Sequence, residues 1–328
     1  MKVLGQWGIG KELDNKHFAK NQGMELLRRD KGPSLGHLVH YYGSEEHFFA
    51  LGMLPECVRH GKPAFKLQHG MSHYNYMSDM TTHPYSESKM VMGSSQHLIG
   101  SNERRREFAQ NYIHAMACIS NLTLLQDHEG INNVYEVYPW SSCAKLVDVG
   151  GSTGHFMASV MKRPGCEHIQ GFVMDLPAVI EEAEKRVNDL GLSSNRIAFI
   201  KQDIMKPFCS LDLHADTVTM KSFICGFADE DKVSALKNCK SLFRGSGRLL
   251  IIEVCSPNPG DLNHNIGLNG RQNGFWNIHM LSACGTSFPS LKEITDTIQE
   301  AGNKAGYKLN QIYNTFPGGY TIFELFTQ

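Results

Sequence analysis

The feature that most constrains the fold is an alternation of short apolar runs with helical patterns in the second half of the chain. Runs that read as buried strands cover residues 144–149, 171–176, 196–203, 217–224 and 248–254. Stretches with helical spacing lie between them, at 155–163, 178–191 and 230–243. Strands that alternate with helices of this length form parallel sheets covered on both faces, so we predict an α/β fold.

The end of the chain adds one more helix and a pair of strands. A helical pattern covers residues 293–307, and strand-like runs cover 308–315 and 319–328. Pro317 and two glycines lie between the runs, which predicts an antiparallel pair at the sheet edge.

The first part of the chain differs from this pattern. Strand signals are scarce there, and residues 86–98 and 107–125 read as helices. We therefore predict a smaller, mostly helical region over 1–140 and a main domain over 141–328.

Charge and cysteine usage narrow the class of protein. The 328 residues carry a formal net charge of -1, so no basic surplus favours a nucleic-acid or membrane-surface partner. The nine cysteines are scattered without CxxC pairs, which predicts reduced thiols in a cytoplasmic protein and neither a disulfide framework nor a metal site. The first residues lack the apolar centre of a signal peptide, and no run approaches the ~18 apolar residues of a membrane span.

A glycine-rich turn follows the first strand of the main domain. In "LVDVGGSTGHF" the glycines Gly150, Gly151 and Gly154 stand between a buried strand and a helix. A turn with so little side-chain bulk lets a ligand approach the backbone, and the helix N-terminus offers free N–H groups. The loop lacks the later Lys-Ser/Thr pair of a Walker phosphate loop.

Two acidic residues end the next two strands. Asp175 follows "GFVM" and Asp203 follows "AFIKQ". Such a residue is often only a helix cap or a turn residue. Ligands of open α/β sheets, however, lie at the carboxyl edge, where an acid that ends the second strand can accept both ribose hydroxyl protons. The order of strand, glycine loop and two strand-end acids predicts a nucleoside ligand.

Several motifs in this order resemble a known family. "LVDVGGSTGHF", "VMDLPAVIEEA", "KQDIMKP" and "IIEV" resemble the class I S-adenosylmethionine-dependent methyltransferases, and "DLPAVI" resembles their caffeate/hydroxyindole-type small-molecule O-methyltransferases. "LPECVRHGKPAF" (54–65) is similar to the linker of that branch, and the likeness runs from about residue 5 to the end. The resemblance implies a Rossmann-like seven-stranded sheet with an antiparallel last strand, and a partial winged helix at the start.

The resemblance also implies the cofactor, S-adenosyl-L-methionine, and its contacts. The loop from Asp148 to Gly154 would hold the methionine part, Asp175 the ribose and Lys221 the polar end. The adenine would lie against three further residues, Leu176, Asp203 and Ile204. The third glycine of the family motif is Ser152 here, which is tolerable if its backbone angle is ordinary.

The residues that the family uses for acid–base catalysis are changed in this chain. The family carries a His-Asp pair where this chain has Cys225-Gly226, and a neutral imidazole is a better base at pH 7 than a thiol. Glu253 matches one supporting acid of the family, whereas the other two positions read as Ser287 and Asn277. Cys225 can be a small buried hydrophobe, a polar contact to substrate or a nucleophile. The candidate catalytic residues are Cys225, Glu253 and His279, although His279 can also be a satisfied or exposed histidine.

The candidate substrate contacts lie on apolar segments that can equally be core. They are Met90, Phe275, Trp276, Asn277 and Met280.

Our leading hypothesis is O-methyl transfer from S-adenosylmethionine to a small, aromatic or polyketide-like molecule. The loss of the family histidine leaves open a non-methylating reaction such as a cyclisation or rearrangement, and a non-catalytic homologue. A homodimer is typical of the family, but the N-terminal helices that form the family dimer have no counterpart in this sequence. Whether the protein dimerises, and whether it is naturally short at this end, therefore stay open.

Overall fold

The computed structural model describes residues 8–13, 17–31, 34–78, 102–124, 134–185, 187–192, 195–208, 213–227, 229–256, 268–314 and 320–328. Contacts divide the chain into two compact units. The first, here the helical unit, comprises Met1–Thr123 and Ser282–Gly285. The second, the sheet unit, comprises Leu124–Leu281 and Thr286–Gln328.

The helical unit begins with a short hairpin of β1 (Lys11–Glu12) and β2 (Phe18–Ala19), in the segment for which the resemblance implies a winged helix. Its helices are α2 (Gln22–Leu26), η2 (Arg29–Lys31), α3 (Leu35–Tyr42), α4 (Glu45–Gly52), α5 (Leu54–His60), α6 (Ala64–His69), α7 (His73–Ser78) and α8 (Asn102–Leu124). Fully buried Tyr41 and Phe65 lie at the centre of an aromatic core with Phe108 and Tyr76. The predicted helical character of this region is confirmed for the described residues, and the predicted helix at 86–98 lies outside them.

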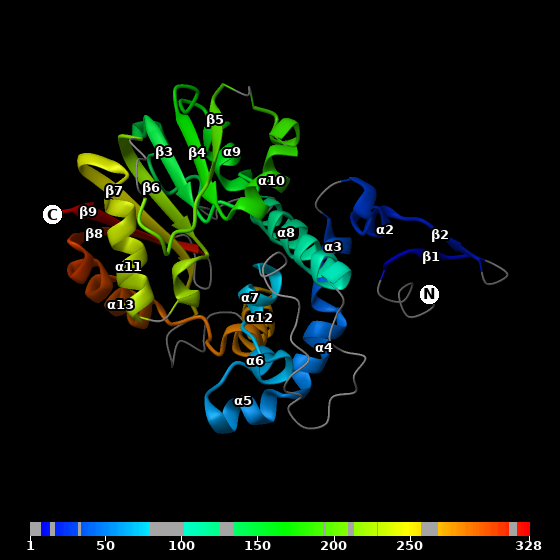
Figure 1. Ribbon diagram of the computed structural model, residues 1–328. Helices are drawn as coiled ribbons and strands as arrows, with labels where there is room; N and C mark the ends of the chain where they lie inside the picture. The colour runs from blue at the N-terminus through cyan, green and yellow to red at the C-terminus, as the bar shows by residue number, and fades with distance from the viewer. Residues whose placement is uncertain are drawn as a thin grey trace. The chain divides into compact units, whose positions relative to one another are not determined.

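The sheet unit contains a seven-stranded sheet in the order β5-β4-β3-β6-β7-β9-β8, which confirms the predicted α/β fold (Figure 1). Its strands are β3 (Lys145–Val149), β4 (Gln170–Asp175), β5 (Ile197–Lys201), β6 (Ala215–Lys221), β7 (Phe243–Val254), β8 (Tyr307–Asn314) and β9 (Tyr320–Thr327). The first five pair in parallel, whereas β9 lies antiparallel between β7 and the edge strand β8. Because β9 runs backwards, its first residue, Tyr320, lies opposite Val254 at the carboxyl end of β7.

Helices cover both faces of this sheet, as the alternating pattern predicts. The elements that follow or cover the strands are η4 (Trp140–Ser142), α9 (His155–Met161), α10 (Pro177–Lys185), η5 (Val187–Leu190), η6 (Ile224–Gly226), α11 (Asp229–Lys240) and α13 (Leu291–Ala305). The helix α12 (Leu268–Cys284) begins in the sheet unit, and its last residues belong to the helical unit. One core joins residues of α11 and α13 to alternate strand residues such as Val147 and Val218. The other joins α9, α10 and residues 134–143 to neighbours such as Leu146 and Leu250.

Several predicted boundaries are wrong by a few residues. The helix predicted over 178–191 ends at Lys185 and is followed by a 3-10 turn, and Gly191 adopts a left-handed φ of 59°. The strand predicted over 217–224 ends at Lys221, because the next residues turn back into η6. β7 begins at Phe243 rather than 248, so α11 ends before Ser241.

The division of the chain falls between residues 123 and 124, earlier than the predicted boundary between 140 and 141. The reason is that Val134, Tyr135, Tyr138 and Trp140 are buried in the second core of the sheet unit. Among the described residues, every helix is too short or too polar to cross a bilayer, and each cysteine is a free thiol.

Candidate active site

The glycine loop after β3 has almost no space for side chains. Gly150 has a φ of 71°, and a Cβ there would lie 2.7 Å from the Phe223 ring. A Cβ on Gly151 would lie 2.7 Å from Oδ2 of Asp148. The backbone N–H groups of both glycines donate to the carbonyl of Met174, which ties the loop to β4. Glycine is therefore required at both positions.

Ser152, which replaces the third family glycine, does not have an ordinary backbone angle. Its φ is 53°, in the left-handed region that costs a residue with a Cβ roughly 1–2 kcal/mol. The sequence predicts that serine is tolerable here only with an ordinary backbone angle, and the structure does not meet that condition. The N–H of Ser152 donates to Oδ2 of Asp175 at 2.8 Å, and this bond holds the strained peptide in place.

Asp175 ends β4 and connects the glycine loop to the next turn. Its other oxygen, Oδ1, accepts from the N–H of Leu176 at 2.7 Å. Burial raises the pKa of Asp175 to about 6, although both amide donors oppose the shift. Leu176 beside it is 38% exposed, so an apolar surface is open next to the carboxylate.

Buried Asp148 on β3 and half-buried Lys221 on β6 lie close enough to interact electrostatically. Oδ1 of Asp148 accepts from the Thr219 hydroxyl at 2.7 Å, and burial raises the pKa of Asp148 to about 7. Burial lowers the pKa of Lys221, but nearby Tyr320, Tyr135 and Asp148 outweigh it and leave the pKa raised. The ammonium of Lys221 donates to the Tyr320 hydroxyl at 3.0 Å.

Asp203 and Ile204 lie just after the end of β5. Oδ1 of Asp203 accepts from the Met205 N–H at 3.0 Å, which is the turn-residue role that a strand-end Asp often has. Ile204 is buried in the core, and its carbonyl accepts from the Asn238 amide. Their contact with a base stays a prediction.

Cys225 lies in a 3-10 turn that Glu253 organises. A single oxygen of Glu253, Oε1, accepts from the N–H groups of Phe223 (2.9 Å), Ile224 (2.9 Å) and Cys225 (3.2 Å). Burial raises the pKa of Glu253 to about 7 against these three donors. Burial, together with the negative charge of Glu253, holds the pKa of the Cys225 thiol well above its usual range. The thiol is therefore protonated at neutral pH.

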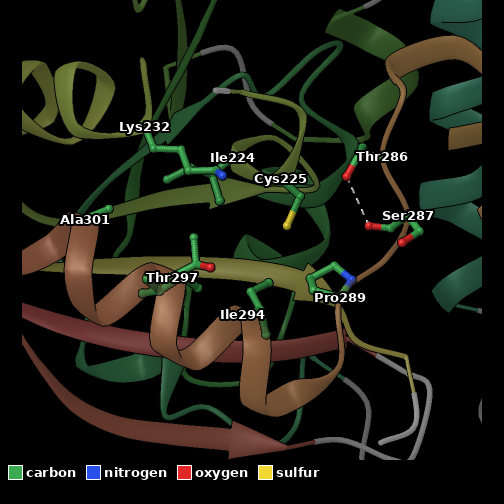
Figure 2. A pocket seen from close by; sticks show the side chains of 10 residues that line it. Ile224, Cys225, Lys232, Thr286, Ser287, Pro289, Ile294, Thr297 and Ala301 are labelled. Carbon is green, nitrogen blue, oxygen red and sulfur yellow. Dashed lines mark hydrogen bonds between the residues drawn. The ribbon is translucent and has the colours of Figure 1, made fainter. Parts of the chain in front are cut away.

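The Cys225 sulfur points into a pocket of about 190 Å³ (Figure 2). Ser287, in the position of a missing family acid, lines the same pocket. The remaining lining residues are Ile224, Lys232, Thr286, Pro289, Ile294, Thr297, Ile298 and Ala301. The structure thus brings Cys225, Glu253 and Ser287 into one region of the sheet unit.

The candidates on α12 have different environments. Oδ1 of Asn277 accepts from the Phe288 N–H at 2.7 Å, so this side chain holds the loop that carries Ser287. Burial lowers the pKa of His279 to about 4, which leaves its imidazole neutral at pH 7. Trp276 and Met280 are half-buried and Phe275 is 53% exposed. Met90 lies outside the described residues.

Two residues of this site carry no sequence signal. Phe223 packs where a Gly150 side chain would project, and Tyr320 binds Lys221 from a strand 99 residues later. Neither belongs to a short motif, and both contacts arise because the ends of β3, β6 and β9 meet at one edge of the sheet.

The sequence of this chain is similar to a known family of proteins. The sequence profile of the O-methyltransferase domain matches residues 52–302. The chain is 26% identical over 189 residues to aclacinomycin 10-hydroxylase of Streptomyces purpurascens, covering 58% of this chain and 47% of that protein. It is 30% identical over 131 residues to 6-hydroxytryprostatin B O-methyltransferase of Neosartorya fischeri, covering 40% of this chain and 30% of that protein. The chain thus spans less than half the length of either relative.

The fold is shared with solved structures. An O-methyltransferase from neocarzinostatin biosynthesis, solved with S-adenosyl-L-homocysteine and 1,4-dihydroxy-2-naphthoic acid, superposes with a TM-score of 0.66 at 18% identity. The superposition covers 99% of this chain and 82% of that one. With the profile match over more than half of its length, this chain belongs to the O-methyltransferase domain family, within the class I S-adenosylmethionine-dependent methyltransferases that its motifs resemble.

Proposed function

We propose that this protein transfers a methyl group from S-adenosylmethionine to an oxygen atom of a small aromatic or polyketide-like molecule. The observation that carries the proposal is the glycine loop bound to the Asp175 carboxylate. The loop has no room for side chains at Gly150 and Gly151, and its Ser152 N–H donates to Asp175. It therefore exposes backbone to a ligand beside a carboxylate that can accept ribose hydroxyl protons.

The buried charges fit a cationic nucleoside. Asp148, Asp175 and Glu253 are buried or half-buried carboxyls whose pKa burial raises to between about 6 and about 7, and Lys221 is a half-buried cation near Asp148. A carboxylate that is costly to ionise in isolation is stabilised by a nearby positive charge. These residues thus favour a ligand that carries a sulfonium and an ammonium.

We assign the cofactor contacts as the resemblance implies them. The loop from Asp148 to Gly154 holds the amino-acid end together with Lys221, and Asp175 holds the ribose. The residues assigned to the adenine are Leu176, Asp203 and Ile204. When bound, the cofactor supplies a methyl group that its sulfonium already activates, so the chain contributes chiefly proximity and orientation.

The part of the site that would bind the methyl acceptor lacks the histidine imidazole that the family uses as a base. The Cys225 thiol holds its proton at neutral pH, so it cannot accept one from a hydroxyl. The Glu253 carboxyl, with its pKa raised to about 7, can exchange a proton near neutral pH from beside Cys225. We propose that the acceptor is a phenol or enol acidic enough to need only this weak assistance, and that α12 residues such as Trp276 and Met280 line its site. His279 remains a candidate for the same role.

The names of relatives support this class of substrate. The second relative is named for O-methylation of a tryprostatin, and the solved neighbour was crystallised with a dihydroxynaphthoic acid. The test is incubation with methyl-labelled S-adenosylmethionine and a panel of phenols and naphthols. Label in a product supports the proposal, whereas no cofactor binding by calorimetry would contradict it.

Asp175→Asn is expected to weaken S-adenosylmethionine binding by ~1–3 kcal/mol. The reason is that a neutral amide replaces the charged carboxylate that would accept the hydrogen bonds of the ribose hydroxyls. Titration calorimetry measures the change. Asp216→Asn is the matched control, since Asp216 likewise accepts from two backbone N–H groups, those of Ala144 and Lys145, at the opposite edge of the sheet. Equal affinity in the two variants would mean that Asp175 does not hold the ribose.

A second candidate function is a non-methylating reaction on the same fold. The protonated Cys225 thiol favours it, and the first relative is named as a hydroxylase. Tight cofactor binding without transfer of label to any acceptor would support this candidate over methylation.

Cys225→His is expected to raise methyl transfer to phenols by about 10²-fold, because a general base contributes 10²–10⁴-fold. Cys225→Ala is the control, since it removes the thiol without adding a base and should leave the rate within about threefold. The labelled-cofactor assay measures both variants. If the histidine variant binds cofactor normally and transfers no more label than the alanine variant, the pocket does not serve methyl transfer to phenols.

We also propose a cytoplasmic location, on the scattered thiols of the sequence, and a homodimer, on the resemblance to the family. Light scattering coupled to gel filtration tests the dimer.

A further inference from the structure

The Lys221 ammonium is held by a residue from the last strand of the chain. Lys221 ends β6, and Tyr320 begins β9, which lies beyond β7 in the sheet. The Lys221 Nζ donates to the Tyr320 hydroxyl at 3.0 Å and lies 4.3 Å from the centre of the Tyr320 ring. The same nitrogen lies 5.9 Å from the centre of the Phe156 ring in α9.

A second residue holds the Tyr320 hydroxyl. The Ser222 hydroxyl lies 2.9 Å from it, and Ser222 has a left-handed φ of 52°. Left-handed backbone is unfavourable for a residue with a Cβ and persists where the surrounding structure requires it. Here the Ser222 N–H donates to the Ile252 carbonyl at 2.8 Å, so the turn that presents its hydroxyl to Tyr320 is anchored on β7.

This arrangement gives a flexible cation one orientation. A free lysine side chain loses rotamer entropy when a ligand fixes it, and that loss weakens binding. Because Tyr320 holds the ammonium before a ligand arrives, that loss does not count against binding. An ammonium carries three N–H donors, so Lys221 can hold Tyr320 and still donate to a carboxylate ligand.

We propose that Tyr320, supported by Ser222, is a positioning residue that orients Lys221 toward the carboxylate of an α-amino-acid nucleoside. The inference rests on the proposed function, since the carboxylate is the one at the amino-acid end of the cofactor. It adds a selectivity: the Lys221–Tyr320 pair favours nucleosides that carry the amino-acid end over those that lack it.

The test compares two neutral thioether nucleosides by titration calorimetry. S-adenosylhomocysteine carries the amino-acid end, and 5′-methylthioadenosine lacks it. Tyr320→Phe keeps the ring and removes the hydroxyl, so it is expected to weaken S-adenosylhomocysteine about three- to tenfold and to leave methylthioadenosine within about twofold. Tyr313→Phe in the adjacent strand β8 is the control and should change neither affinity.

Ser222→Gly is a second variant that relieves the left-handed strain, and it should weaken S-adenosylhomocysteine in the same direction by about two- to fivefold. Equal affinities in wild type and Tyr320→Phe, or an equal loss for both nucleosides, would overturn the inference. If the wild-type protein binds neither nucleoside, the proposed function has failed rather than this assignment.

Discussion

Replacing Glu253 by alanine is expected to lower the free energy of unfolding by about 3–5 kcal/mol, because it leaves three N–H groups of one turn without their acceptor. A single oxygen, Oε1, accepts from residues 223, 224 and 225. Each buried donor that loses its partner costs ~1–3 kcal/mol, and the removed side chain also leaves a cavity. Relief of the buried carboxyl, whose pKa is raised to about 7, offsets part of this loss.

Glu253→Gln separates the structural role of this residue from a chemical one. The amide keeps an oxygen in the place of Oε1, so its unfolding free energy should stay within about 1 kcal/mol of wild type. Urea denaturation measures both variants. If Glu253 also exchanges a proton with the acceptor, the glutamine variant will be folded and slow in the label-transfer assay. Equal stability of the alanine and glutamine variants would show that the turn does not depend on Oε1.

Replacing Gly150 by alanine is expected to weaken cofactor binding by about 2–4 kcal/mol, roughly 30- to 1,000-fold. The residue has a φ of 71°, and a new Cβ would lie 2.7 Å from the Phe223 ring. In the free protein the loop can shift to relieve this overlap. Binding must then restore the loop geometry, so the cost appears in the affinity.

Gly245→Ala is the matched control for Gly150→Ala. Gly245 also has a left-handed φ, 87°, but nothing lies within 4 Å of a Cβ built there. Its alanine variant should therefore be modestly less stable and bind S-adenosylmethionine as wild type does. Titration calorimetry on the two variants isolates the contact with Phe223. Wild-type affinity in Gly150→Ala would mean that the loop does not approach the ligand.

Much of the fold and half of the site could be predicted from short stretches of sequence. The alternation of strands and helices predicts an α/β sheet, and the seven-stranded sheet confirms it together with the antiparallel last strand that the family resemblance implied. Asp175 and the glycines could be proposed as cofactor contacts because each belongs to a short motif at the end of a strand, and the bond between the Ser152 N–H and Asp175 joins the two motifs. Boundaries were less accurate, since the end of β6 and the start of η6 depend on Glu253, which lies in another strand.

Local pattern could not assign the roles that depend on contacts between distant segments. The substrate contact of Asn277 stays a prediction, but no sequence signal indicates that its side chain accepts from the Phe288 N–H, 11 residues away. Ser152 read as a mild replacement, whereas the bond to Asp175 holds it in left-handed backbone. A backbone angle is set jointly by the local sequence and by the hydrogen bonds that the fold supplies.

The sequence by itself determined the alternation of strands and helices, the glycine turn and the acids at the strand ends, because each is a property of residues close along the chain. Only the tertiary structure decided that Glu253 supports the turn of Cys225 and that Tyr320 holds Lys221. Those pairs are 28 and 99 residues apart. They meet because parallel strands, and one strand running the other way, bring their ends to the same edge of the sheet.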